Sequence, residues 1–215
     1  QTCALPIFGY APSAAVYFNL QKAPLVKGSG MLAMALGNSK LDGFTALPGS
    51  DREVKSIARS YPDGKVISGK DFTEAGLRRS IGSAEQIHLA THGVLDAAFP
   101  LNSYLLMHPE GVDDGRLTVN EILDLRLHAR LITLSACETG LGALNEGDEL
   151  IGLSRSFLYA GSSGIVVSLW KVDDATTAWL MTRFYQHMNA GHNASTALSL
   201  AQRELTIPGA INEKE

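Results

Sequence analysis

The 215-residue sequence is poor in cysteine, containing only Cys3 and Cys137. Two cysteines cannot build the dense disulfide framework of a small secreted protein, so we expect a reducing compartment, most simply the cytoplasm. The sequence also lacks any apolar run near the roughly 18 residues that a membrane-spanning helix needs, and it shows no signal peptide. We therefore expect no membrane contact.

An excess of basic residues is also missing. Lysine and arginine number 18 against 22 aspartate and glutamate, giving a formal net charge of −4. A nucleic-acid-binding protein usually concentrates positive charge, so this balance disfavours direct nucleic-acid contact. No histidine or cysteine pair has zinc-ligand spacing, and the glycines at 140, 142 and 147 lack the Gly-Lys-Ser/Thr ending of a P-loop. We expect neither a metal nor another cofactor.

The chain divides unevenly into three parts. Residues 1–7 match the in-frame translation of a common sequencing adapter, so we interpret them, Cys3 included, as non-native. Residues 8–30 form a linker or the remnant of an upstream region. Residues 31–215 contain alternating strand and helix patterns, and this length suits one domain with a full hydrophobic core.

Hydrophobic periodicity and capping signals predict the elements of that domain. Alternation of strands with helices indicates an α/β fold, with a mostly parallel central sheet and helices on both faces. Ser50 with Glu53, and Thr118 with Glu121, form possible capping boxes at two helix starts. The strands are predicted at 31–36, 65–68, 86–93, 101–107, 131–137 and 163–170, and the helices at 50–61, 73–81, from 118, 148–159, 173–190 and 194–205.

Two of these strands deliver reactive side chains to their carboxyl ends. Leu131–Cys137 is an apolar strand that ends in Cys137, and Gln86–Gly93 is another that ends in His92 and Gly93. The intervening chain has room for one strand and a crossover helix, so we expect the two strands to be parallel neighbours. A cysteine beside a histidine at this edge is the arrangement of a cysteine nucleophile.

The chemistry of such a pair is acyl transfer. His92 would act as general base, and Cys137 would attack a peptide carbonyl while the backbone N–H groups of Gly93 and Cys137 hold the oxyanion. The alternative is that Cys137 is only a small buried hydrophobe. His88, on the same strand, is more simply explained as a histidine packed in the sheet.

Asp173 and Asp174 follow the last predicted strand and have two open interpretations. Either residue can cap the long helix that begins there. Either can instead line a substrate pocket, where a carboxylate would favour arginine or lysine before the scissile bond.

Five short motifs occur along the chain in this order: His88-Leu-Ala-Thr-His92-Gly93, Asp114-Gly-Arg-Leu117, Leu134-Ser-Ala-Cys137-Glu-Thr-Gly140, Glu146-Gly147 and Ser168-Leu-Trp170-Lys-Val-Asp-Asp174. Together these motifs resemble the CHAT domain, the caspase-like module usually found with tetratricopeptide repeats. The resemblance runs from about residue 31 to 205 and implies a caspase-like three-layer sandwich and a Cys–His endopeptidase, with His92 and Cys137 at the catalytic positions.

The resemblance also bears on specificity and regulation. The Leu169–Asp174 segment is similar to the separase segment that supplies a carboxylate to the specificity pocket, which favours Asp174 over Asp173. Separases carry aspartate where this chain has Lys171, so basic specificity does not transfer simply. The resemblance further implies control by an upstream repeat region or partner, in bacterial signalling or defence. The alternatives are a catalytically idle peptide-binding module and a cysteine hydrolase or acyltransferase for small molecules.

Overall fold

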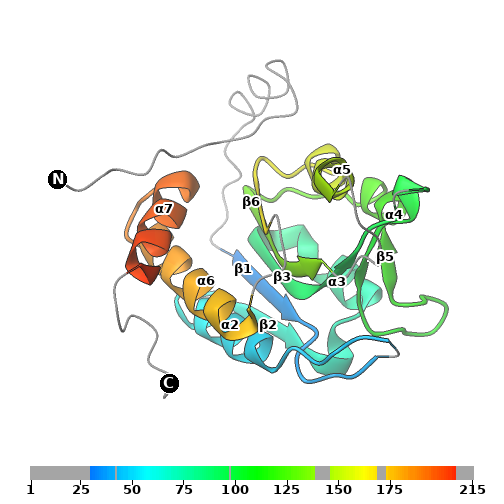
Figure 1. The fold of residues 1–215 in the computed structure, drawn as a ribbon, viewed down its shortest axis with the longest axis horizontal. Helices are drawn as coiled ribbons and strands as arrows, with labels where there is room; N and C mark the ends of the chain where they lie inside the picture. The colour runs from blue at the N-terminus through cyan, green and yellow to red at the C-terminus, as the bar shows by residue number, and fades with distance from the viewer. Residues whose placement is uncertain (1–29, 42, 97, 139–145, 169–172, 207–215) are drawn as a thin grey trace.

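A mixed β-sheet forms the centre of the molecule. The computed structural model describes residues 30–41, 43–96, 98–138, 146–168 and 173–206, and within them the sheet has seven strands (Figure 1). Five strands are parallel neighbours, in the order β2 (Lys65–Ser68), β1 (Gly30–Ala35), β3 (Ala84–Val94), β6 (Leu131–Glu138) and β7 (Ile165–Val167). The strands that carry His92 and Cys137 are therefore adjacent.

Two short strands make the sheet mixed instead of uniformly parallel. β4 (Tyr104–Leu106) pairs antiparallel with the end of β3, and β5 (Arg116–Thr118) pairs antiparallel with β4. Antiparallel strands need only a short connection, which here includes the 3₁₀ helix η3 (Pro100–Asn102). The sheet was predicted to be mostly parallel, and the antiparallel β4–β5 hairpin is the part of it that departs from the parallel arrangement.

Helices flank the sheet on both faces, which confirms the α/β prediction in its coarse form. On one face α2 (Pro48–Arg59), α6 (Asp174–Asn189) and α7 (Ala194–Leu205) contribute buried residues to a shared cluster. On the other face the core is built by α3 (Glu74–Ser80), α4 (Val119–Leu123) and α5 (Glu146–Tyr159). Two further 3₁₀ helices, η1 (Gly69–Asp71) and η2 (Ile81–Ser83), flank α3.

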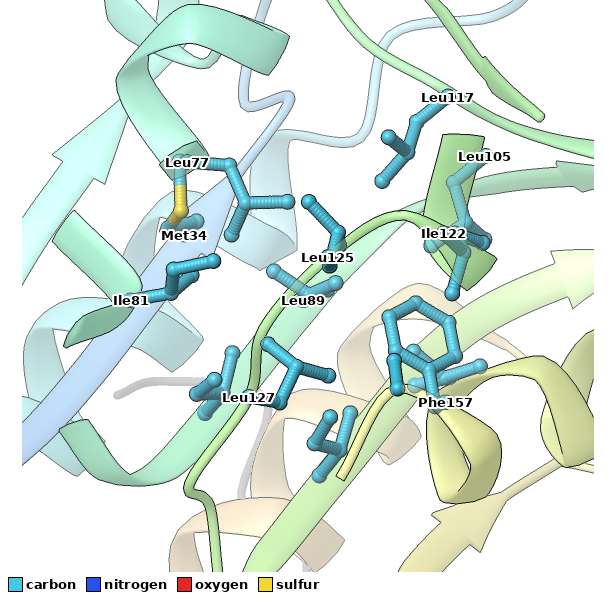
Figure 2. Packing of buried hydrophobic residues seen from close by; sticks show 14 of the residues in the cluster. Met34, Leu77, Ile81, Leu89, Leu105, Leu117, Ile122, Leu125, Leu127 and Phe157 are labelled. Carbon is cyan, nitrogen blue, oxygen red and sulfur yellow. The ribbon is translucent and has the colours of Figure 1, made fainter. Parts of the chain in front are cut away.

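Alternation along β1 shows how one strand serves both cores. Leu32 and Met34 pack toward α3 and α5, whereas Met31, Ala33 and Ala35 pack toward α2 and α6. A strand covered on both faces reads as a continuous apolar run, which is why the sequence pattern identifies it. Figure 2 shows the cluster on the α3 and α5 side, in which Leu89 of β3 lies among Leu77, Leu125 and Leu127.

The predicted helix starts are partly right. Thr118 and Glu121 form the expected capping box at α4, with the Thr118 N–H donating to Glu121 Oε2 at 2.8 Å. The box predicted at Ser50 and Glu53 is wrong, because α2 already begins at Pro48 and has Leu47 at its N-cap. Proline is favoured in the first helical turn, where its missing N–H has no intrahelical partner. Ser50 and Glu53 are therefore interior residues of α2, and both are buried.

The strand predicted at 163–170 also differs from expectation. Residues 163–168 of it are described, and only Ile165–Val167 form a strand, β7, whose only partner among the described strands is β6. The run Ile165–Val167 is thus an edge strand there, although its β-branched composition is typical of a central one.

Candidate active site

His92 and Cys137 lie side by side on the two central strands. β3 and β6 pair in register from Gln86 with Leu131 to Gly93 with Glu138, and this register puts His92 opposite Cys137. Neighbouring strands are about 4.8 Å apart, and paired residues share a face of the sheet. The expectation that these two strands are parallel neighbours is confirmed.

The His92 ring is held by a main-chain oxygen. Its Nε2 lies 2.8 Å from the Thr45 carbonyl oxygen, and the side chain is buried. A carbonyl only accepts hydrogen bonds, so this contact assigns the proton to Nε2. Nδ1 is then the free lone-pair nitrogen, and it has no hydrogen-bond partner among the described residues. The geometry leaves a ring nitrogen available as a base.

Phe44 and Thr45 belong to the loop that joins β1 to α2. The Phe44 ring packs against the imidazole, with centroids 5.4 Å apart. The base of this loop is closed by hydrogen bonds from the Leu47 N–H to the Gly37 carbonyl at 2.9 Å and from the Gly37 N–H to Ser50 Oγ at 3.1 Å. Ser50 Oγ in turn donates to the Leu47 carbonyl at 2.7 Å. The Thr45 carbonyl is therefore presented by a loop with a fixed base.

A buried polar layer lies along the same face of β3 and β6. His88 pairs in register with Thr133, four residues before the His92–Cys137 pair. Thr133 Oγ1 accepts a hydrogen bond from the Tyr185 hydroxyl at 2.8 Å, and the Tyr185 ring meets the His88 ring edge-on. Burial raises the pKa of the Tyr185 hydroxyl, which therefore stays protonated in the folded protein. His88 is packed in the sheet as predicted, and Glu53 of α2 faces it.

Gly93 follows His92 at the junction of the sheet and the β4–β5 hairpin. It pairs with Glu138 of β6 and also with Leu105 of β4, and it is buried. The Thr91 hydroxyl donates to the Leu106 carbonyl on the same hairpin. The hairpin therefore closes the sheet directly beside the candidate catalytic histidine.

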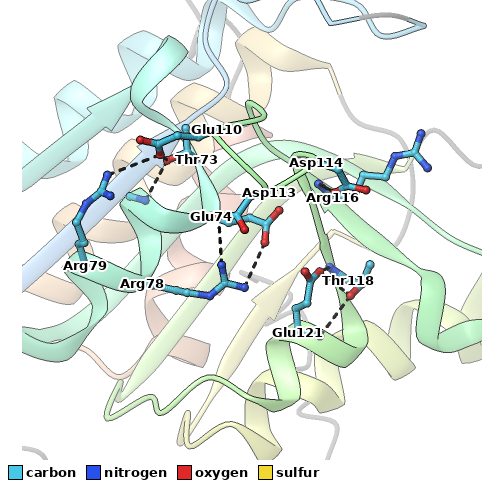
Figure 3. Close-up of polar contacts among 11 residues, drawn as sticks. Thr73, Glu74, Arg78, Arg79, Glu110, Asp113, Asp114, Arg116, Thr118 and Glu121 are labelled. Atoms are coloured by element: carbon cyan, nitrogen blue, oxygen red, sulfur yellow. Dashed lines mark hydrogen bonds and ion pairs between the residues drawn. The ribbon is translucent and has the colours of Figure 1, made fainter.

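A polar network links the connection between β4 and β5 to α3 (Figure 3). Arg78 contacts the buried Glu74 at 3.2 Å and Asp113 at 3.6 Å. Thr73 Oγ1 donates to Glu110 at 2.5 Å. Burial, reinforced by nearby carboxylates, raises the pKa of Glu74. This network lies on the face of the sheet opposite His88, because Leu77 of the same helix packs in the other core.

Asp173 has the capping role that was one of its two interpretations. Its carboxylate accepts hydrogen bonds from the Thr176 N–H and hydroxyl, both at 2.9 Å, at the start of α6. These hydrogen bonds lower the pKa of Asp173. The Asp174 side chain, the Cys137 side chain, Gly140, Gly142 and Lys171 lie outside what the structure describes.

The described residues contain no group of three or more histidine, cysteine or acidic side chains placed to hold a metal ion. They also contain no helix long and apolar enough to cross a membrane.

Sequence reasoning missed two contributors to the site. Thr45 acts through its carbonyl, which any residue would supply, so no sequence signal marks it. Glu53 did leave a signal, because it lies on the apolar face of α2 beside Val54 and Ile57. A carboxylate on the buried face of a helix indicates a buried polar partner.

The fold and site together define an α/β domain with a histidine–cysteine pair at neighbouring strand ends. Comparison with known families matches residues 7–213 to the CHAT domain. The chain belongs to the CHAT domain family.

Relatives connect the domain with tetratricopeptide repeats. The chain is similar to tetratricopeptide repeat protein 28 of Mus musculus, at 36% identity over 84% of the chain, and to the Homo sapiens protein of that name, at 24% identity over 84% of the chain. The chain spans only 9% of the length of either relative. Among solved structures, the Streptococcus pneumonia TIGR4 flavodoxin aligns with 76% of this chain and 99% of its own, at 13% identity and a TM-score of 0.43, which is too weak to carry an inference.

Proposed function

We propose that this domain is a caspase-like cysteine endopeptidase that uses His92 and Cys137 as its catalytic dyad. The observation that carries the proposal is the strand register, in which the two residues are paired on the adjacent strands β3 and β6. This pairing puts both positions at the carboxyl end of the parallel strands, where α/β sheets place their active sites.

The arrangement of His92 supports a specific division of labour between its nitrogens. Nδ1 accepts the proton of the Cys137 thiol, and the thiolate sulfur attacks the substrate carbonyl carbon. Nε2–H remains bonded to the Thr45 carbonyl at 2.8 Å, which orients the ring and stabilises the imidazolium that forms. The Thr45 carbonyl thus takes the position of a third, orienting group.

The remaining steps use the same groups. The backbone N–H groups of Gly93 and Cys137 stabilise the oxyanion of the tetrahedral intermediate. Collapse of this intermediate breaks the C–N bond, and His92 returns its proton to the leaving amine. Water then hydrolyses the thioester with His92 again as base, releasing the second product and restoring the thiol.

The substrate is an extended peptide, and the specificity carboxylate is Asp174. Asp173 is the weaker candidate for this role, because its carboxylate is already engaged by Thr176 at the start of α6. A carboxylate at the pocket favours arginine or lysine before the scissile bond.

Regulation by a repeat region completes the proposal. The relatives are tetratricopeptide repeat proteins and are far longer than this chain, which supports an upstream repeat region as sensor. A protease of this kind acts in signalling or defence when its sensor or a partner engages a target.

Peptide cleavage tests the function directly. The chain is incubated with a library of extended peptides, and new termini are identified by mass spectrometry. We expect cleavage that is lost in both His92→Ala and Cys137→Ala, with peptide binding retained in Cys137→Ala. Binding without cleavage by the wild-type chain, even with the repeat region of a relative added, would instead indicate an idle peptide-binding module.

A further inference from the structure

Glu53 is a carboxylate sealed inside the molecule between α2 and the sheet. Only 2% of the residue is exposed, and its Oε1 lies 2.9 Å from Nε2 of His88, which is fully buried. The two atoms are at ion-pair distance, although their directions do not form a regular hydrogen bond. His88 Nδ1 has no hydrogen-bond partner among the described residues, so Glu53 is the polar group that His88 faces.

Stability alone does not explain such a pair. Taking an ionisable pair out of water opposes folding, and replacing it with apolar residues of similar size is often neutral or stabilising. The neighbours of Glu53 on the buried face of α2 are Val54 and Ile57, so an apolar residue would fit the pattern there. What the pair supplies is a short polar contact between α2 and β3, where apolar packing alone would let the helix slide.

A chain of contacts leads from Glu53 along α2 to His92. Ser50 lies one turn before Glu53 and ties the start of the helix to the end of β1, through its bonds with Gly37 and Leu47. Thr45 lies two residues before Leu47, and its carbonyl meets His92 Nε2 at 2.8 Å. A shift of α2 along the sheet would carry the Thr45 carbonyl with it.

The other end of the pair is fixed to the strand that carries the histidine. His88 and His92 lie on the same strand and face, and the His88 ring is held edge-on by Tyr185 with centroids 5.6 Å apart. Tyr185 is bonded to Thr133 on β6, the strand of Cys137. Glu53 therefore connects the loop between β1 and α2 to β3 and β6, the two strands that carry His92 and Cys137.

We propose that Glu53 and His88 are positioning residues, which set α2 against β3 so that the Thr45 carbonyl holds His92 in the Nε2–H tautomer. The catalytic consequence rests on the proposed function, whereas the tautomer of His92 does not depend on it.

Four variants separate positioning from stability. Glu53→Leu keeps similar volume but removes the polar contact, and Glu53→Gln keeps a polar group facing His88. Glu74→Leu is the matched control, because it removes another fully buried carboxylate, on the opposite face of the sheet. Ser50→Ala breaks the loop closure directly and serves as a second test should Glu53→Leu not fold.

The first readout is the ¹⁵N spectrum of the histidine side chains. We expect one Nε2–H tautomer for His92 in the wild-type chain, in Glu53→Gln and in Glu74→Leu, and mixed tautomers in Glu53→Leu and Ser50→Ala. The second readout is Cys137 alkylation at pH 6, in a Cys3→Ala background. It should fall about a hundredfold in Glu53→Leu and Ser50→Ala, the size of effect expected from a displacement of about 1 Å.

An unchanged His92 tautomer in folded Glu53→Leu and Ser50→Ala would overturn the positioning role, as would an equal loss of the tautomer in Glu74→Leu. A tautomer that changes as expected supports the positioning role even if wild-type Cys137 proves unreactive. An unreactive Cys137 would contradict only the proposed protease function.

Discussion

His92 Nε2 and the carbonyl oxygen of Thr45 lie 2.8 Å apart across 47 positions of the chain. The contact joins the end of β3 to the loop between β1 and α2, and it leaves Nδ1 as the free ring nitrogen. The geometry of this loop thus sets the tautomer of His92, so substitutions in the loop should test the account.

Gly37 at the base of this loop should tolerate substitution poorly. It has φ of 67°, and an added Cβ would meet the Asp51 carboxylate at 2.7 Å. We expect Gly37→Ala to lower the free energy of unfolding by at least the roughly 1–2 kcal/mol of left-handed backbone strain. Urea unfolding measures this.

Gly43 in the same loop is the matched control. Its φ is 84°, but an added Cβ would meet nothing within 4 Å. Gly43→Ala should therefore show the backbone strain alone. Equal losses in the two variants would mean that the close approach of the added Cβ to Asp51 has no energetic weight.

The Tyr185 hydroxyl should matter more than that of Tyr61. Tyr185→Phe leaves Thr133 Oγ1 without its buried donor, a loss of about 1–2 kcal/mol. Tyr61→Phe removes a hydrogen bond of 3.0 Å to Gln86 at a partly buried site and should cost less. Thermal unfolding of both variants makes the comparison, and a larger loss in Tyr61→Phe would contradict it.

The stability difference between the wild-type chain and the neutral variant Asp173→Asn should depend on pH. Hydrogen bonds from Thr176 lower the pKa of the folded carboxyl below its unfolded value of about 3.9. The stabilisation is therefore fully present above that value and is lost as the pH falls through the lowered folded pKa. Because Asp173 is exposed, we expect Asp173→Asn to be less stable at pH 7 by no more than about 0.5 kcal/mol.

The measurement is the free energy of unfolding of both proteins between pH 7 and pH 2.5. Their difference should shrink as the pH falls from the unfolded pKa toward the acid end. A difference that stays constant over this range would show that the carboxylate charge contributes nothing to the cap.

The sequence predicted those features that depend on local pattern. The apolar runs ending in His92 and Cys137 predicted two neighbouring strands, and the register confirms this. The Thr118–Glu121 box was also predicted correctly, because both partners are local.

Features that depend on tertiary contacts were not predictable in the same way. Ser50 and Glu53 have the spacing of a capping box, but Pro48 starts the helix earlier and turns both side chains toward the sheet. The position of Ile165–Val167 in the sheet depends on which strands flank it, which its own composition does not encode. Thr45 could not be identified because its contribution is a main-chain carbonyl.

The rate of Cys137 alkylation by iodoacetamide as a function of pH tests the dyad most directly, since it requires no substrate. The measurement uses the Cys3→Ala chain with and without His92→Ala. We expect reactivity to persist well below pH 8.5, near which a free cysteine thiol titrates, and to be lost at low pH in the His92→Ala chain. Reactivity that rises only near pH 8.5 in both proteins, or an inert Cys137, would contradict an assembled His92–Cys137 dyad.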